Sequence, residues 1–524
     1  MLMAFLRGRI RGLAALISIA LVALVSATAW AATSLPAPTS DPFYSPTGSW
    51  QSAAPGSVLK TRQVTISLAG TVAPYSGTQV LYRTTNQLGE PSATVATIIH
   101  PTASGPTKLL SYQTFYDGDA STCRPSYTLQ SDNPSDTSGD LDEPFILSYL
   151  NQGFTVVTSD YEGPTDDYGA GRESGQNTLD AILAAEHELT LTPETTPVAL
   201  LGYSGGATAT EWAAELQPTY APELDIIGSA AGGIPDDFWH NLAYINGSSD
   251  WAGAMPSVLL GLMRAYKLDI DTYLSAEGRQ IIAAVSQGCL NPSAYPGLHY
   301  QELFKPQYQN FTKVPIFTRI FNDSIMGRMS VPRGAQLMGV GDSDGTGDGV
   351  MVTKDVQQLA YEYCERGANV ELHIYDGADH DAAAGEFEPE ALAFLDELYD
   401  GQTPSDGCSS ITPGNPLTPV PVPAAPGTPL KLALHSVRVN ARRTAVTAAV
   451  LATGGVARDV TVKLIRGRTV IARVVIARVG AKPRGVRLSK EGRSLRSGRY
   501  SIVVLLGDRR MIIRPLRIRR ARVA

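Results

Sequence analysis

The sequence predicts an α/β domain followed by a smaller all-β domain, and three observations carry this prediction. Short apolar strands alternate with helical patterns between residues 32 and 409, which favours a mostly parallel sheet with helices on both faces. Prolines crowd residues 410–429, a composition typical of an extended linker. Residues 430–524 show regularly spaced short strands, which are typical of a small, immunoglobulin-like β-sandwich.

The elements of the first domain follow in chain order. Early strands are expected at residues 64–69, 79–83, 93–100, 108–113 and 155–159. A helix is expected over 178–189, and later strands at 198–201, from 225, at 334–340 and at 370–375, with a helix over 354–365. From about residue 235 to 313 the pattern is helical without a clear strand, so we expect a cap inserted into the core domain.

Residues 1–31 have the pattern of a secretory signal. Arg7, Arg9 and Arg11 precede an apolar stretch at 13–25, and Ala29-Trp30-Ala31 resembles a cleavage site. The apolar run is short for a membrane span, and no later stretch is long and apolar enough to cross a bilayer. We therefore expect a bacterial protein that is exported without a transmembrane span and is extracellular or associated with the cell envelope.

Charge is distributed very unevenly along the chain. The net charge is −7, but residues 428–524 carry 24 of the 43 Lys and Arg and only 3 of the 50 Asp and Glu, which makes them +21. Residues 32–427 carry −31. Such asymmetry indicates units with different partners. Two partners fit the basic domain, an anionic cell-envelope polymer or the acidic domain of its own chain, whereas no nucleic-acid recognition motif accompanies it.

The pentapeptide Gly202-Tyr203-Ser204-Gly205-Gly206 carries the chemistry. It follows an apolar strand pattern and precedes a helical one, and this context is typical of a nucleophile elbow. Glycines permit so tight a turn, and the free N–H groups at the helix start can stabilise an oxyanion. Ser204 is the predicted nucleophile.

A serine nucleophile needs a base and an acid that orients the base, and after an elbow the chain order is Ser, acid, His. Three histidines stand at suitable distances before the linker. His299 belongs to the cap and His373 lies inside a strand pattern, whereas His380 follows the last strand in a predicted loop. His380 is therefore the predicted base.

The acid is expected in the loop at residues 341–350. Asp342, Asp344 and Asp348 all remain candidates by position. Calcium binding is an alternative role for an Asp- and Gly-rich loop, but the EF-hand register fails because the twelfth position has no glutamate. Four cysteines in an exported chain suggest disulfides, and they allow three pairings.

Further motifs between about residues 41 and 408 resemble the secretory triacylglycerol lipase family typified by fungal lipase A. They are the elbow, Asp41-Pro42-Phe43-Tyr44, Tyr82-Arg83-Thr84, Ser111-Tyr112-Gln113 with Asp117, Asp160-Tyr161-Glu162-Gly163-Pro164, Cys364-Glu365-Arg366-Gly367-Ala368-Asn369-Val370 and Asp379-His380. Asp348-Gly349-Val350-Met351 matches the run in which the family's acid opens the next helix, although Val352 stands where the family ordinarily has proline.

The resemblance implies an α/β-hydrolase fold with a helical cap and a serine carboxylic ester hydrolase that needs no cofactor. It implies a triad of Ser204, His380 and Asp348, an oxyanion hole at Gly205 and Asp117, and disulfides Cys123–Cys289 and Cys364–Cys408. The family's cap forms an apolar tunnel, so a lipid ester is the expected substrate. Two other functions fit the same features, an acyltransferase of this fold and an inactive hydrolase-fold protein that binds the envelope.

Overall fold

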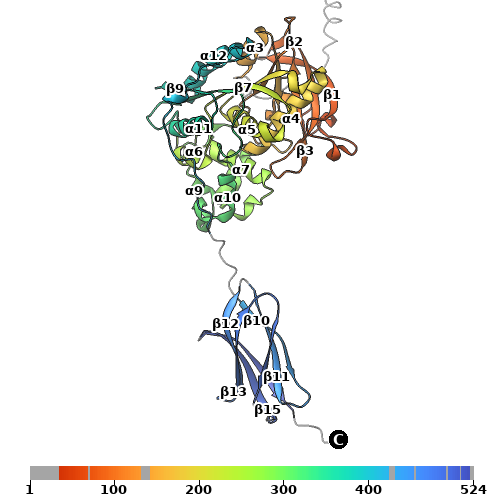
Figure 1. Ribbon diagram of the computed structural model, residues 1–524, viewed down its shortest axis with the longest axis vertical. Helices are drawn as coiled ribbons and strands as arrows, with labels where there is room; N and C mark the ends of the chain where they lie inside the picture. The colour runs from red at the N-terminus through yellow and green to blue at the C-terminus, as the bar shows by residue number, and fades with distance from the viewer. Residues whose placement is uncertain are drawn as a thin grey trace, which may run out of the picture. The chain divides into compact units, whose positions relative to one another are not determined.

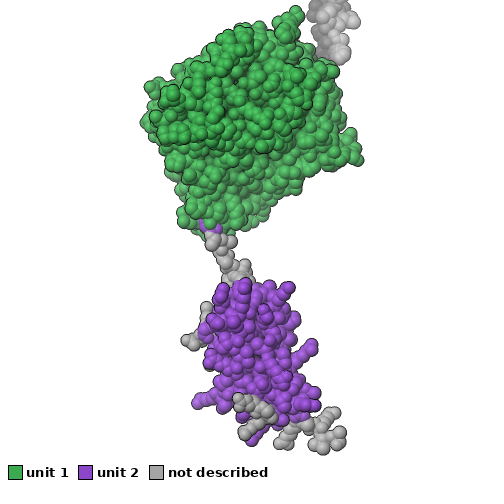
Figure 2. Space-filling view, in the orientation of Figure 1, with its two compact units in different colours: residues 1–422 green, residues 423–524 purple. Residues whose placement is uncertain are grey.

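The chain divides into two compact units, residues 1–422 and 423–524 (Figure 2). The structure is a computed structural model that describes residues 35–68, 71–130, 142–423, 431–453, 456–490, 494–507 and 509–519. The predicted signal at residues 1–31 lies outside the described residues. Within those ranges, no helix is both long and apolar enough to cross a bilayer.

One nine-stranded sheet organises the described part of the first unit, in the order β1-β2-β3-β5-β4-β6-β7-β8-β9 (Figure 1). Strands β1 (Val58–Leu68), β2 (Thr71–Thr85) and β3 (Pro91–Ile99) are antiparallel, and β3 is antiparallel to β5 (Phe154–Ser159). From β5 onward the sheet is parallel. These parallel strands are β4 (Lys108–Gln113), β6 (Pro197–Tyr203), β7 (Asp225–Gly232), β8 (Ala335–Asp342) and β9 (Val370–Asp376).

Helices cover both faces of this sheet, as the alternating pattern predicts. Helices α4 (Gly171–Leu189), α5 (Gly205–Tyr220) and α11 (Thr353–Glu365) pack on one face, and α3 (Glu143–Asn151) and α12 (His380–Tyr399) pack on the other (Figure 1). Strand β6 serves both cores, because Val198 and Leu200 belong to the first while Ala199 and Leu201 belong to the second. A strand buried on both faces is a continuous apolar run, which is the pattern that precedes the elbow.

A helical insertion separates β7 from β8. It contains α6 (Phe238–Tyr244), α7 (Ala254–Ala265), α8 (Ala276–Val285), α9 (Tyr300–Leu303) and α10 (Pro315–Asp323). Its described residues form none of the sheet's strands, and most of its large apolar side chains pack into the first unit's main core. Helix α10 begins after residue 313, where we expected the cap to end, so the insertion is longer than predicted.

The boundary between the two units falls inside the segment predicted as a linker, residues 410–429. Leu417 is buried in the core of the first unit. The Asn322 side chain donates to the Val420 carbonyl (2.7 Å) and accepts from its N–H (2.9 Å). These contacts place the residues up to Val422 in the first unit. The sequence did not reveal this, because proline density alone does not distinguish a packed extended chain from a free spacer.

The second unit consists of two antiparallel sheets in its described residues. One contains β10 (Lys431–Val439), β11 (Ala445–Thr453) and β14 (Arg484–Ser489). The other contains β13 (Thr469–Val479), β12 (Ala457–Arg466), β15 (Gly498–Leu506) and β16 (Arg509–Ile518). Their facing side chains form one apolar core, in which Val460, Val462 and Leu464 are fully buried. Strand β14 was not predicted, because Arg484 and Arg487 leave only two apolar side chains in six residues.

Candidate active site

Ser204 lies at the sharp turn between β6 and α5, with φ +55° and ψ −121°. A positive φ is strained for a residue with a side chain, and the surrounding structure must hold it. The Ser204 N–H donates to the Gly232 carbonyl (2.8 Å) across the sheet. A Cβ at Gly202 would lie 2.4 Å from the Gly206 carbonyl oxygen, and one at Gly206 would lie 2.0 Å from that of Gln113. Both glycines are therefore required by close backbone approach.

The His380 side chain reaches this hydroxyl from α12, which packs on the sheet face opposite α5. Its Nε2 lies 2.8 Å from Ser204 Oγ. We expected His380 in a loop, but it is the first residue of α12, whose N-cap is Asp379. Only three residues separate β9 from α12, so the helix start is held at the carboxyl edge of the sheet. Tyr203 fixes this start by donating its hydroxyl to the His380 carbonyl (2.7 Å).

Asp348 is the acid that the structure brings to the imidazole. Its Oδ2 lies 2.8 Å from His380 Nδ1, and both side chains are buried. Its Oδ1 accepts from the N–H groups of Val350 (3.0 Å) and Met351 (2.7 Å), so the carboxylate is oriented within its own loop. Helix α11 starts at Thr353, so Asp348 precedes the helix rather than opening it.

The other two candidate acids have different partners. Asp344 is exposed, and its Oδ2 accepts from the Tyr244 hydroxyl (2.9 Å). Asp342 accepts from the Gly345 N–H (2.8 Å) within the same loop. Neither has a recorded contact with His380. Among the described residues, no group of three or more Asp, Glu, His or Cys is arranged to hold a metal ion.

The remaining histidines named from the sequence stand elsewhere. His373 lies in β9, where its two ring nitrogens contact Glu390 (2.5 Å) and Glu371 (3.0 Å). His299 is an exposed residue of the cap, just before α9. Neither lines the cavity around Ser204.

The electrostatics keep the imidazole basic. Burial lowers the pKa of His380, but the charge and hydrogen bond of Asp348 outweigh burial, and the net pKa lies above the ordinary 6.5. A base whose pKa lies near or above neutrality is suited to taking a proton from a hydroxyl.

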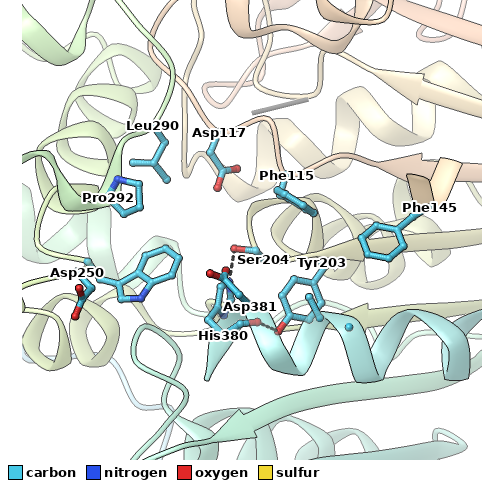
Figure 3. A pocket seen from close by; sticks show the side chains of 13 residues that line it. Phe115, Asp117, Phe145, Tyr203, Ser204, Asp250, Leu290, Pro292, His380 and Asp381 are labelled. Carbon is cyan, nitrogen blue, oxygen red and sulfur yellow. Dashed lines mark hydrogen bonds between the residues drawn. The ribbon is translucent and has the colours of Figure 1, made fainter. Parts of the chain in front are cut away.

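Gly205 and Asp117, the two residues expected to form an oxyanion hole, lie directly beside each other. Gly205 is the first residue of α5, where backbone N–H groups lack helical partners. A Cβ on Gly205 would lie only 1.6 Å from Asp117 Oδ1, so the loop after β4 lies directly against the elbow. Burial raises the pKa of Asp117 to about 6, and Tyr168 donates its hydroxyl to Asp117 Oδ2 (3.2 Å). Figure 3 shows the Asp117 carboxyl pointing toward the space above Ser204.

Ser204 and His380 open into a cavity of about 560 Å³ (Figure 3). Its lining is mainly apolar and comes from the core and the cap together: Phe115, Phe145, Tyr203, Trp251, Leu290, Pro292 and Ala384. The Trp251 and His380 rings pack nearly perpendicular to each other, with the ring centroids 5.1 Å apart. Apart from Tyr203 of the elbow, these lining residues could not be named from the sequence, because no local pattern separates a cap residue in a cavity wall from one in the cap's own core.

The structure pairs Cys123 with Cys289 and Cys364 with Cys408. This is the pairing implied by the family resemblance. The first disulfide joins the segment after β4 to the cap, and the second joins α11 to the segment after α12.

A family model described as "Secretory lipase" matches residues 130–407, which is more than half of the chain. The chain belongs to the secretory lipase family. Lipase 2 of Candida albicans is 34% identical over 404 residues, covering 71% of this chain and 83% of that protein. A crystal structure of Candida antarctica lipase A in its closed state superposes with a TM-score of 0.64 at 30% identity and covers 75% of this chain and 91% of that one.

These comparisons confirm the α/β-hydrolase fold and support the assignment of this lipase as a carboxylic ester hydrolase. One similar protein, from Mycobacterium tuberculosis, is described as a probable inactive lipase and is 32% identical over 383 residues, covering 70% of this chain and 84% of that protein. Family membership alone therefore does not establish the serine mechanism.

Proposed function

We propose that this lipase hydrolyses lipid esters through an acyl-enzyme formed on Ser204. The observation that carries the proposal is the continuous contact from Ser204 Oγ through the His380 imidazole to Asp348, at the mouth of an apolar cavity. A hydroxyl, an imidazole and a carboxylate in this order constitute the machinery of a serine esterase, whatever the fold.

The proposed chemistry has two halves. His380 Nε2 takes the Ser204 proton as Oγ attacks the ester carbonyl, and the imidazolium then protonates the departing alcohol. Asp348 holds the proton on Nδ1, so that Nε2 is free to act as the base, and stabilises the imidazolium. The peptide N–H groups of Gly205 and Asp117 receive the oxyanion, and one such donor contributes about 3 kcal/mol of transition-state stabilisation. Water, activated by the same imidazole, then releases the acid.

The cavity supports a lipid ester as substrate. Most of its lining is apolar, and its volume suits a ligand of several carbon atoms beyond the carbonyl. The acidic side chains of Asp250 and Asp381 also border the cavity and are exposed. Carboxylates at the mouth repel a fatty-acid anion, and this favours release of the charged product over rebinding.

Hydrolysis of p-nitrophenyl esters of increasing acyl length by the wild type and by Ser204→Ala tests the proposal. We expect activity that rises from acetyl toward longer chains and falls by at least about a thousandfold in the variant. Activity confined to acetyl esters would contradict the lipid substrate, and an active Ser204→Ala protein would contradict the mechanism.

The two alternatives have separate tests. Products formed in the presence of an added alcohol distinguish a hydrolase from an acyltransferase of the same fold. Labelling of Ser204 by an alkyl fluorophosphonate distinguishes an active enzyme from an inactive envelope-binding protein. Export directed by residues 1–31 and binding of an anionic envelope polymer by residues 430–524 stay predictions, and fungal and mycobacterial relatives alike leave the bacterial source a prediction.

A further inference from the structure

The loop that contains Asp117 is paired with residues 288–290 of the cap through an isolated β-bridge. Leu290 donates its N–H to the Asp117 carbonyl (2.8 Å), and Asp119 donates to the Gly288 carbonyl (3.3 Å). Between these bonds, Gly118 and Cys289 form an antiparallel bridge. The cap therefore adds a backbone hydrogen bond to the core loop at Asp117, the residue whose N–H is proposed to bind the oxyanion.

The Cys123–Cys289 disulfide locks this pairing from one side. A Cβ on Gly118 would lie 2.9 Å from both Cys123 Cβ and Cys123 Sγ, and 3.2 Å from Cys289 Cα. Glycine is thus required at 118 because the disulfide packs directly on its backbone. Cys123 is fully buried and clusters with Ala209 of α5, the helix that follows Ser204, so the disulfide also contacts the nucleophile's own helix.

The core holds the first half of the loop, and the core residue Glu162 also interacts with the Gly118 N–H. The Tyr161 hydroxyl donates to the Thr114 carbonyl (2.7 Å), and the Glu162 N–H donates to the Tyr116 hydroxyl (2.8 Å). The Asp117 side chain also accepts from the Tyr168 hydroxyl. These contacts fix the chain as far as Asp117.

The cap holds the second half of the loop. Besides the two strand bonds, Arg264 of α7 donates to the Asp119 carbonyl (2.9 Å). The cap bonds the carbonyl of the peptide that follows Asp117, whereas Glu162 of the core faces its N–H, so the backbone dihedrals of Asp117 are set jointly by core and cap.

We propose that the 117–119/288–290 pairing, locked by Cys123–Cys289, is a positioning device that aims the Asp117 N–H at the oxyanion and fixes one cavity wall relative to it. This inference depends on the proposed serine mechanism. Leu290 directly follows Cys289 and borders the cavity together with Pro292, so one cap segment both forms part of the cavity wall and bonds the oxyanion loop (Figure 3). The cysteines act through Asp117 and are positioning residues rather than catalytic ones.

The physical reason is the steep dependence of oxyanion stabilisation on geometry. A donor contributes only when it lies at hydrogen-bond distance from the place where the charge develops, and a displacement of about 1 Å costs on the order of a hundredfold in rate. The apolar lining of the cavity does not require such accuracy, because burial of an acyl chain is not directional. Loosening the pairing should therefore lower kcat far more than it raises KM.

Cys123→Ser/Cys289→Ser tests the device, with Cys364→Ser/Cys408→Ser as the matched control. The control also removes one disulfide, but that disulfide joins α11 to the segment after α12 and does not join the oxyanion loop to the cap. Both variants should lose thermal stability. Only the first variant should lose kcat, by about 10- to 100-fold, with KM changed less than about threefold. Its Ki for an alkylboronic acid should rise by a similar factor, because the tetrahedral boronate adduct occupies the oxyanion hole.

A second pair of variants leaves both disulfides intact and guards against misfolding of the first. Leu290→Pro removes the N–H that donates to Asp117, whereas Leu290→Ala keeps it and trims only the cavity wall. We expect Leu290→Pro to lower kcat and weaken boronic acid binding, and Leu290→Ala to change mainly the acyl-length preference. Equal kcat in the two cysteine variants, or in the two Leu290 variants, would overturn the inference. The proposed function would still stand in that case, provided that hydrolysis by the wild type depends on Ser204.

Discussion

The choice of triad acid gives the sharpest prediction, because position in the sequence left Asp342, Asp344 and Asp348 all open. In Asp348→Asn the amide oxygen can keep the two backbone bonds that Asp348 Oδ1 makes with Val350 and Met351, so the loop retains its shape. The NH₂ group then faces His380 Nδ1 at 2.8 Å and can only donate. The imidazole must accept at Nδ1 and carry its proton on Nε2, where it cannot act as the base for Ser204.

We expect Asp348→Asn to lower kcat by about 10⁴, which corresponds to about 5.4 kcal/mol of barrier. Asp344→Asn is the matched control, because that side chain is exposed and contacts Tyr244 rather than the imidazole. It should retain kcat within about threefold. The assay is p-nitrophenyl ester hydrolysis at saturating substrate, with circular dichroism to check folding. A large loss in Asp344→Asn together with a small loss in Asp348→Asn would refute the reasoning.

The kcat/KM of the wild type should fall as the pH drops, with a midpoint above 6.5, because Asp348 raises the pKa of His380 and the imidazolium cannot accept a proton; a midpoint below 6.5 would contradict this. Burial raises the pKa of Glu211 to about 8, so between pH 4.5 and 8 the folded state binds one proton more than the unfolded state, and stability falls as the pH rises. Denaturant titrations of Glu211→Gln should show this slope reduced by about 1.4 kcal/mol per pH unit, whereas Glu302→Gln at the surface should not change it. Gly206→Ala places a Cβ 2.0 Å from a backbone oxygen and should cost about 1–3 kcal/mol or more of unfolding free energy, so an unchanged Tm would exclude the close approach. A chain ending after Val422 should keep the Tm and activity of the first unit, but one ending after Ile411 loses buried Leu417 and should be about 2 kcal/mol less stable; equal stability of the two truncations would contradict the packing of the linker's first half.

Much of the fold could be predicted because the signals are local. Strands β4 and β10 occupy the predicted residues 108–113 and 431–439, and most other strands differ from prediction by a few residues at their ends, whereas β1 and β2 begin well before their predicted starts at residues 64 and 79. An apolar run buried on both faces, as in β6, and the Gly-Ser-Gly turn after it are readable because backbone geometry acts within a few residues. The errors occurred where local pattern is silent: the start of α12 at His380, the strand β14 with its arginines, and the packed half of the proline-rich segment.

The sequence by itself determined the chemistry that one turn can hold: a serine that must adopt a positive φ between glycines, with free N–H groups of a helix start beside it. Only the tertiary structure decided which of several aspartates meets the imidazole, which apolar residues of the cap form the cavity wall, and that the cap itself completes the oxyanion loop. The reason is that these contacts join residues from 32 to about 170 positions apart, and such proximity is set by how strands order themselves in the sheet and not by any pattern along the chain.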